Sequence, residues 1–409
     1  MAITDLLAYL SSWAAVLGMA LLAAIGLLSG RFSWLTGRWS IDAVMRIHQQ
    51  LGRVVLILFM AHPLFYFLGD IRMSGSGLGL GFLALFALIA VVVMALSRDE
   101  LPMRYEAWRR SHGLLAIGAL GLGLAHAQSG GWLGQTIPAV HWGLVGSTAV
   151  GVMALAWIYV IRPWALLRRP FRVVGLQEIS DRTWELRLEQ VSGPSFRYQA
   201  GQFAWIKTQS AFGLHDHPFS IATAPAQSEA ADRPVELGFL IKAVGDFTSH
   251  LEQHVPLGQT VYLDGPYGTF GQGLVQAPRL LLVAGGIGLA PLLSVLQARR
   301  DWLRSNPASL VTQVVIGNRH PGQYFADQDL TDSPGLGLQV HRLVSEPTKS
   351  WTGLVGQTDA TGLGPLLPAD PADWQALVCG PPPMMQTVQS VLVKHGFKRN
   401  QIHMETFKT

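Results

Sequence analysis

Residues 48–62 read HQQLGRVVLILFMAH, and residues 112–126 read HGLLAIGALGLGLAH. Each stretch is largely apolar and carries a histidine at both ends, 14 residues apart. Because 14 residues make close to four turns of α-helix, both histidines of a stretch project from one helix face, about 21 Å apart along the axis. The sequence therefore predicts two helices that each present one histidine near either end of a membrane-crossing length.

The apolar residues are concentrated in the N-terminal part of the chain. The 409 residues are 49% hydrophobic and 14% charged, which is too apolar for an ordinary soluble protein and too long for one domain. Charges are sparse up to about Ile161 and regular afterwards. Five runs are long enough to cross a bilayer, at residues 6–28, 46–68, 77–97, 109–127 and 138–161.

The charges between these runs predict the orientation of the chain in a lipid bilayer. Arginines cluster in residues 29–46, in residues 98–110 and after the fifth run, whereas the alternate connections hold only Arg72. The positive-inside rule then places the N-terminus outside and the C-terminal half in the cytoplasm. The single cysteine, Cys379, excludes an internal disulfide framework, and the net charge of +4 indicates no nucleic-acid partner.

The four histidines form two candidate metal sites. A lone intramembrane histidine can simply hydrogen-bond a neighbouring helix, and this remains the alternative for each one taken singly. The equal spacing on two helices instead predicts two His–His clamps, His48 with His112 toward the cytoplasm and His62 with His126 toward the outside. Neutral imidazole is a suitable axial ligand of haem iron, so we expect each clamp to hold one b-type haem.

The C-terminal half has a different pattern. Short runs rich in β-branched and aromatic residues, from about Phe171 to Gly268, predict a small antiparallel β-barrel. From Arg279 onward strands alternate with helices, which predicts a parallel sheet with crossover helices, an α/β nucleotide-binding architecture. The expected fold is thus multidomain, with an all-α transmembrane bundle of about five spans in residues 1–165, the barrel in 166–275 and the α/β domain in 276–409.

Five short motifs follow one another in this half. They are HPFS at residues 217–220, KAVGDFTS at 242–249, GPYG at 265–268, GGIGLAP at 285–291 and CGPP at 379–382. These motifs are similar to the flavin and pyridine-nucleotide motifs of the ferredoxin-reductase-like superfamily. Joined to the two histidine helices, they make almost the whole chain resemble the NADPH oxidase and ferric reductase superfamily, in particular its bacterial NADPH oxidase homologues.

The resemblance implies an FAD site on the barrel domain. A turn of small residues before a helix over residues 248–254 would also present backbone N–H groups to a pyrophosphate. An ordinary strand and a solvated loop remain the alternatives for HPFS and KAVGDFTS. The implied FAD-binding residues are His217, Pro218, Phe219, Ser220, Lys242, Gly245, Asp246, Phe247, Thr248, Gly265, Tyr267 and Gly268.

The resemblance likewise implies a site for NADPH in the α/β domain. The glycines of GGIGLAP follow a strand and open a helix, which lets the backbone approach a pyrophosphate. Their spacing is not G-x-G-x-x-G, so a plain strand–helix turn remains the alternative. The implied coenzyme-binding residues are Gly285, Gly286, Ile287, Gly288, Pro291, Arg319, Cys379, Gly380 and Pro381.

Three of the expected site residues have roles of their own. Arg319 follows the second strand of the α/β domain, where arginine suits a 2′-phosphate, so we expect NADPH as the coenzyme; a surface arginine and the use of NADH remain open. The resemblance places Cys379 near the nicotinamide, although a buried cysteine can be core filler. It also places Phe407 over the flavin ring, as a residue that both binds FAD and takes part in catalysis. A terminal aromatic can also simply pack on a strand.

The resemblance implies a superoxide-generating flavohaem NADPH oxidase in a bacterial inner membrane. Electrons would pass from cytoplasmic NADPH through FAD and two haems to external molecular oxygen. A ferric-chelate reductase and an electron-donating subunit for a periplasmic protein or quinone remain alternatives. Members of the superfamily usually have six spans against the five counted here, and no calcium-binding loop or regulatory domain is evident, so no regulatory subunit is expected.

Overall fold

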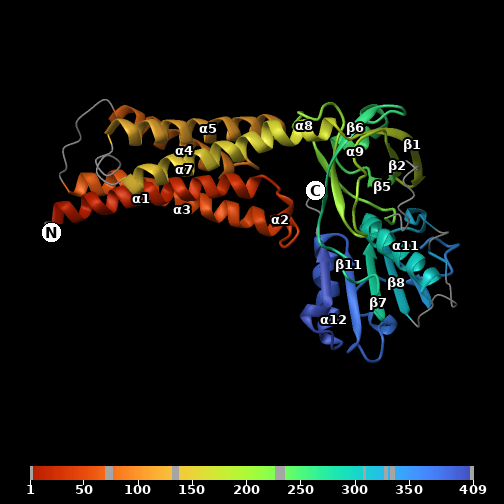
Figure 1. The fold of residues 1–409 in the computed structure, drawn as a ribbon. Helices are drawn as coiled ribbons and strands as arrows, with labels where there is room; N and C mark the ends of the chain where they lie inside the picture. Colours follow the sequence, from red (N-terminus) through yellow and green to blue (C-terminus); the bar gives the residue numbers. More distant parts are fainter. Residues whose placement is uncertain are drawn as a thin grey trace. The chain divides into compact units, whose positions relative to one another are not determined.

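The computed structural model describes residues 3–69, 77–130, 138–225, 235–306, 310–326, 330–331 and 337–405. Within them the chain forms two compact units, Met1–Ala165 and Leu166–Thr409. The first unit is helical and the second contains the two β-sheets (Figure 1).

Long helices make up the first unit. α3 packs against α1, α4 packs against α5, and α7 packs against α1. A buried cluster formed by Ile25, Val55, Leu88 and Ala119 joins the four helices α1, α3, α4 and α5. The helices are α1 (Ile3–Ser29), α2 (Ser33–Thr36), α3 (Ile41–Leu68), α4 (Gly77–Leu96), α5 (Tyr105–Gly130), α7 (Pro138–Ala156), a π-helical turn (Trp157–Ile161) and α8 (Arg162–Leu167).

Four of these helices are long and apolar enough to cross a membrane. They are Ile3–Ser29, Ile41–Leu68, Gly77–Leu96 and the continuous stretch His141–Leu167. The fourth predicted span, residues 109–127, forms α5, which is of similar length but is not among these four helices. Its first turns carry Glu106, Arg109 and Arg110, and glycines and two histidines interrupt its apolar surface.

The first sheet of the second unit is the expected antiparallel barrel. Its six strands are ordered β4-β3-β6-β1-β2-β5, and a bridge between Ile221 and Phe239 links the two ends of that order. Side chains that alternate along the strands, such as Leu186 and Leu188, fill the interior. The strands are β1 (Pro170–Ser180), β2 (Thr183–Gln190), β3 (Phe203–Lys207), β4 (His217–Ser220), β5 (Glu236–Lys242) and β6 (Thr260–Tyr267).

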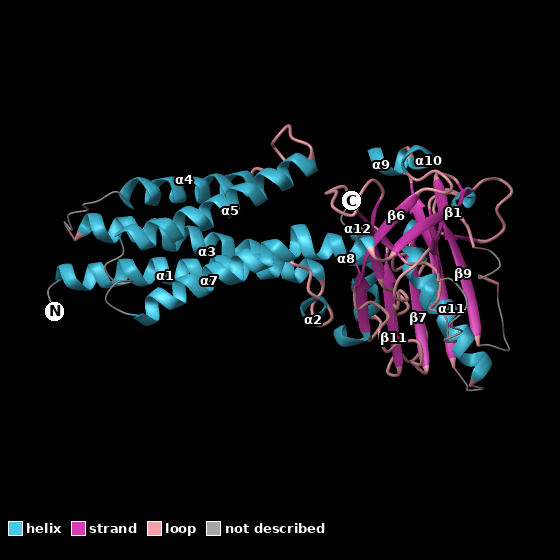
Figure 2. Ribbon diagram, turned by 45° about the horizontal axis from the view of Figure 1, so that its top comes forward, coloured by secondary structure: helices cyan, strands magenta, loops and turns pink. Residues whose placement is uncertain are grey.

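The second sheet is parallel and covered on both faces (Figure 2). Leu280 and Leu282 of β7 pack in one core with α11 (Leu289–Ser305), whereas Leu281 and Val283 pack in another with α12 (Pro382–Lys394). Strand β7 is therefore apolar without interruption, as expected for a doubly covered strand. The strands are β7 (Arg279–Gly285), β8 (Val311–Asn318), β9 (Leu338–Val344), β10 (Leu354–Val355), β11 (Trp374–Cys379) and β12 (Ile402–Glu405), in the order β10-β9-β8-β7-β11-β12.

Candidate functional site

The first unit brings the four predicted histidines together in two pairs. The ring centres of His48 on α3 and His112 on α5 lie 6.5 Å apart, and those of His62 and His126 lie 5.9 Å apart. Because a metal–imidazole bond is about 2 Å long, two imidazoles that coordinate one metal ion from opposite sides have ring centres roughly 6 Å apart. Both pairs thus have the separation that a bis-histidine haem requires.

Hydrogen bonds at Nδ1 orient three of these rings. Nδ1 lies 3.2 Å from the Ile25 carbonyl oxygen in His48, 3.0 Å from that of Ser11 in His62 and 2.8 Å from that of Gly77 in His126. A carbonyl oxygen only accepts, so Nδ1 donates and Nε2 of the neutral ring keeps its lone pair. A histidine that binds a metal through one ring nitrogen usually donates a hydrogen bond from the other, which fixes its tautomer and orientation.

The fourth ring differs from the other three, and a glycine lies beside one of the pairs. The buried Nδ1 of His112 makes no hydrogen bond, and the ring is oriented instead by the indole of Trp108, which stacks on it with centres 5.2 Å apart. A Cβ at Gly81 of α4 would lie 2.8 Å from the His126 ring, so only glycine fits there. Among the described residues, no group of three or more His, Cys, Asp or Glu side chains is arranged to hold a bare metal ion. A pair of histidines becomes a complete site when a porphyrin supplies the other ligands.

The barrel domain brings HPFS and KAVGDFTS together. The His217 ring stacks on Phe247 with centres 3.8 Å apart, and Phe219 lies 6.3 Å from the same ring. Thr248 Oγ1 accepts hydrogen bonds from the backbone N–H groups of Val244 and Gly245, both at 3.0 Å, which holds the turn that follows Lys242. Instead of one helix over 248–254, the chain forms two single turns, Asp246–Ser249 and Leu251–His254, separated by His250.

The GPYG residues, which are the end of β6 and the glycine after it, lie close to these residues in the barrel. Strand β3 pairs with Pro218 and Ser220 of β4 on one side and with Tyr267 of β6 on the other. The Tyr267 hydroxyl donates to the buried Asp264 carboxylate at 2.8 Å. Gly268 has φ +94°, and a Cβ there would lie 3.3 Å from Glu405 Oε1, so the turn borders the end of β12. Phe407 lies outside the described residues.

The glycine loop lies at the topological switch point of the parallel sheet. The chain order reverses at β7, which has β8 on one side and β11 on the other, and ligands of such sheets bind outside the carboxyl ends of the strands. Gly286 has φ +53°. A Cβ at Gly288 would lie 2.2 Å from the Cys379 carbonyl oxygen, and one at Gly285 would lie 3.0 Å from Pro381. The GGIG and CGPP loops therefore touch through positions where only glycine fits.

Cys379 is fully buried, and burial raises the pKa of its thiol. The thiolate is the reactive form, so a raised pKa and lack of access both slow its reaction. We expect iodoacetamide to leave Cys379 unmodified in the folded protein at pH 8 and to alkylate it in 8 M urea, as measured by intact-mass spectrometry. Rapid alkylation without urea would contradict the buried placement.

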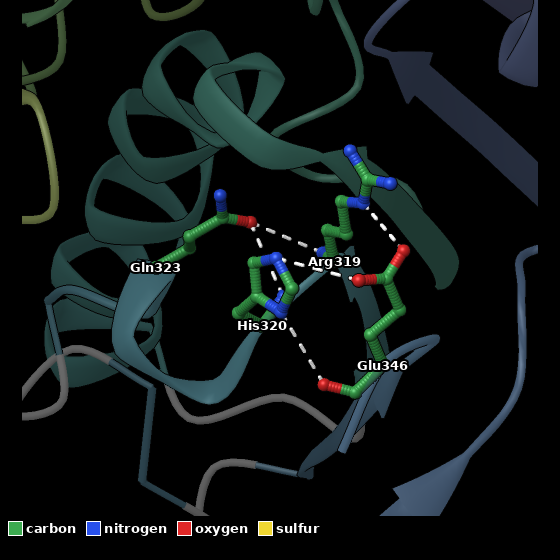
Figure 3. Close-up of polar contacts among 4 residues, drawn as sticks. All are labelled: Arg319, His320, Gln323 and Glu346. Carbon is green, nitrogen blue, oxygen red and sulfur yellow. Dashed lines mark hydrogen bonds and ion pairs between the residues drawn. The ribbon is translucent and has the colours of Figure 1, made fainter. Parts of the chain in front are cut away.

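Arg319 lies where the sequence placed it, directly after β8, but with a partner that the sequence did not reveal. Its Nε donates to Glu346 Oε1 at 2.6 Å (Figure 3). Glu346 follows β9, and its only sequence signal is its place after the next strand of the sheet.

Three family descriptions match this chain in consecutive segments. "Ferric reductase like transmembrane component" matches residues 14–123, "FAD-binding domain" matches residues 169–270, and "Oxidoreductase NAD-binding domain" matches residues 282–390. The chain thus combines a ferric-reductase-like transmembrane component with an FAD-binding domain and an NAD-binding domain, and these three matches define its class. The chain has the domain architecture of the NADPH oxidase and ferric reductase superfamily, as its motifs predicted.

Individual relatives match part of the chain. The reductase component of propane 2-monooxygenase from Mycolicibacterium smegmatis is 27% identical over 54% of this chain and 62% of its own length. An NADH-cytochrome b5 reductase 1 from Ajellomyces capsulatus is 28% identical over 39% of this chain and 53% of its own. The chain thus spans between one half and two thirds of these relatives. A solved ferredoxin reductase of carbazole 1,9a-dioxygenase shares 23% identity over 59% of this chain and 69% of its own, with a TM-score of 0.49.

Proposed function

We propose that this protein is a superoxide-generating NADPH oxidase, in which electrons from NADPH pass through FAD and two bis-histidine b-type haems to external oxygen. The observation that carries the proposal is the pair of His–His separations, 6.5 Å and 5.9 Å, on the same two helices. Two histidine clamps about four helical turns apart provide two redox sites at different depths of a bilayer.

The residues of the first unit prepare both clamps before a haem binds. Carbonyl groups of Ile25, Ser11 and Gly77 fix the rings of His48, His62 and His126, so that each presents Nε2 rather than Nδ1. These carbonyls belong to α1 and to the start of α4, not to the histidine helices. The flanking helices therefore act as positioning elements.

The second unit would hold the two organic cofactors. Flavin accepts two electrons at once and releases them singly, which is the conversion that haem requires. The barrel residues around His217 and Phe247 would hold FAD, and the loops at Gly285–Gly288 and Cys379–Pro381 would hold the coenzyme. We further propose a bacterial inner membrane location with the N-terminus outside and the second unit in the cytoplasm, because the arginine-rich connections lie on one side.

Reduction of cytochrome c that superoxide dismutase inhibits tests the proposal. The purified protein, loaded with haem, receives NADPH and FAD in detergent. We expect rapid cytochrome c reduction that dismutase suppresses, with the protein lacking added NADPH as the control. Haem reduction without dismutase-sensitive signal would contradict the oxidase proposal.

Such an outcome would favour the ferric-chelate reductase or a subunit that feeds a periplasmic partner or quinone. The sequence favours oxygen, because the outer connection AQSGGWLGQTIP at residues 127–138 has no carboxylate or histidine that could bind ferric ion. Adding a ferric chelate in place of oxygen under anaerobic conditions distinguishes these candidates.

A further inference from the structure

The pairing of Arg319 follows from the parallel register of β8 and β9. The two strands pair up to Asn318 and Val344, and hydrogen bonds continue beyond their ends, from Ser345 N to Asn318 O and from Glu346 N to Arg319 O at 2.8 Å. This register places Arg319 and Glu346 side by side at the carboxyl edge of the sheet, 27 residues apart in the chain.

The Glu346 carboxylate lies between two basic side chains. Oε1 accepts from Arg319 Nε at 2.6 Å, and Oε2 lies 3.5 Å from His320 Nε2 (Figure 3). Gln323 Oε1 accepts hydrogen bonds from the backbone N–H groups of Arg319 and His320, which fixes the chain at this point. The cluster is therefore held in place from both strand ends.

The ion pair leaves most of the guanidinium available to a ligand. Guanidinium has five N–H donors, and Glu346 takes the one on Nε. In Figure 3 the two terminal nitrogens of Arg319 point away from the residues drawn. The side chains of Arg319 and Glu346 are 69% and 49% exposed. The pair lies beside the glycine loop, because a Cβ at Gly286 would lie 3.9 Å from Oδ1 of Asn318, the residue before Arg319.

We propose that Glu346 is a coenzyme-selectivity residue that opposes Arg319 and makes the protein accept both NADPH and NADH. This inference rests on the proposed function of the α/β domain. The terminal nitrogens of Arg319 suit a 2′-phosphate, which a carboxylate 2.6 Å from Nε repels. The same carboxylate accepts a hydrogen bond from the free 2′-hydroxyl of NADH. Arg319 can thus bind the 2′-phosphate of NADPH and Glu346 the 2′-hydroxyl of NADH, so the protein selects neither coenzyme strongly.

Anaerobic stopped-flow reduction of the bound flavin at 450 nm tests this with the full-length, FAD-loaded protein. We expect Glu346→Gln to raise the ratio of the second-order rate constants of flavin reduction, NADPH over NADH, by about tenfold, because the variant removes a like charge that opposes the 2′-phosphate but is screened by its exposure to solvent. Arg319→Gln should lower the rate with NADPH and leave the rate with NADH nearly unchanged. Asp373→Asn removes an exposed carboxylate at the opposite edge of the same sheet and should leave the ratio unchanged.

The role of Glu346 would be overturned if Glu346→Gln left the NADPH-to-NADH ratio unchanged while Arg319→Gln lowered the rate with NADPH. It would also be overturned if Asp373→Asn raised the ratio as much as Glu346→Gln, because the net charge of the protein would then explain the effect. If neither coenzyme reduces the flavin of the wild-type protein, the proposed function itself fails. The readout precedes haem and oxygen, so it does not depend on the external acceptor.

Discussion

We expect His62→Ala to abolish electron delivery to the outside while NADPH still reduces FAD. The substitution removes one ligand of the outer clamp, whose ring centres lie 5.9 Å apart, and leaves His48 and His112 in place. Removing the hydrogen-bonding partner of a metal-binding histidine lowers metal affinity or activity roughly 10- to 100-fold. Removing the histidine itself should have a larger effect, so we expect the dismutase-sensitive rate to fall at least about 100-fold. Absorbance of reduced haem should show one haem per chain instead of two.

Two further variants make the result interpretable. His141→Ala changes a histidine of α7 that belongs to neither pair and should retain both haems and the external rate. Ser11→Ala removes the hydroxyl that lies 2.8 Å from His62 Nδ1 but keeps the Ser11 carbonyl, so the loss should be smaller than in His62→Ala. Normal external reduction in His62→Ala would exclude the two-haem scheme.

Gly288→Ala should block coenzyme-dependent reduction of the flavin and leave both haems bound. The new Cβ would lie 2.2 Å from the Cys379 carbonyl oxygen and 2.7 Å from the Gly380 nitrogen, and backbone atoms cannot rotate away as a side chain can. The GGIG and CGPP loops must then separate. Because a displacement of about 1 Å in a reacting complex costs roughly 100-fold, we expect a loss of that size in NADPH-dependent flavin reduction.

Gly364→Ala is the matched control for this variant. A Cβ at Gly364, in the same α/β domain, meets no atom within 4 Å, so the rate should stay close to that of the wild type. FAD content and haem absorbance should be unchanged in both variants. Full flavin reduction by Gly288→Ala would show that contact between the two loops does not determine coenzyme binding.

Local patterns explain most of the architecture that the sequence predicted. The uninterrupted apolar run of β7 explains why its side chains pack alternately into two cores, one on each face of the sheet. The strands of the barrel correspond to short runs in which apolar residues recur at every second position. Where local signals compete, the prediction was less accurate. The helix expected over residues 248–254 breaks at His250. The run at residues 109–127 forms the expected helix, α5, but α5 is not among the four helices that are apolar enough to cross a membrane.

The sequence by itself determined the spacing of the histidines, because 14 residues always span about four turns of a helix. It also determined which loops are rich in glycine. Only the tertiary structure decided the partners of these groups: the carbonyls that orient the histidine rings come from α1 and α4, and Gly81 makes room for His126. Glu346 reaches Arg319 only through the parallel pairing of β8 and β9. Such contacts join residues that are distant in the chain, and no local period encodes them.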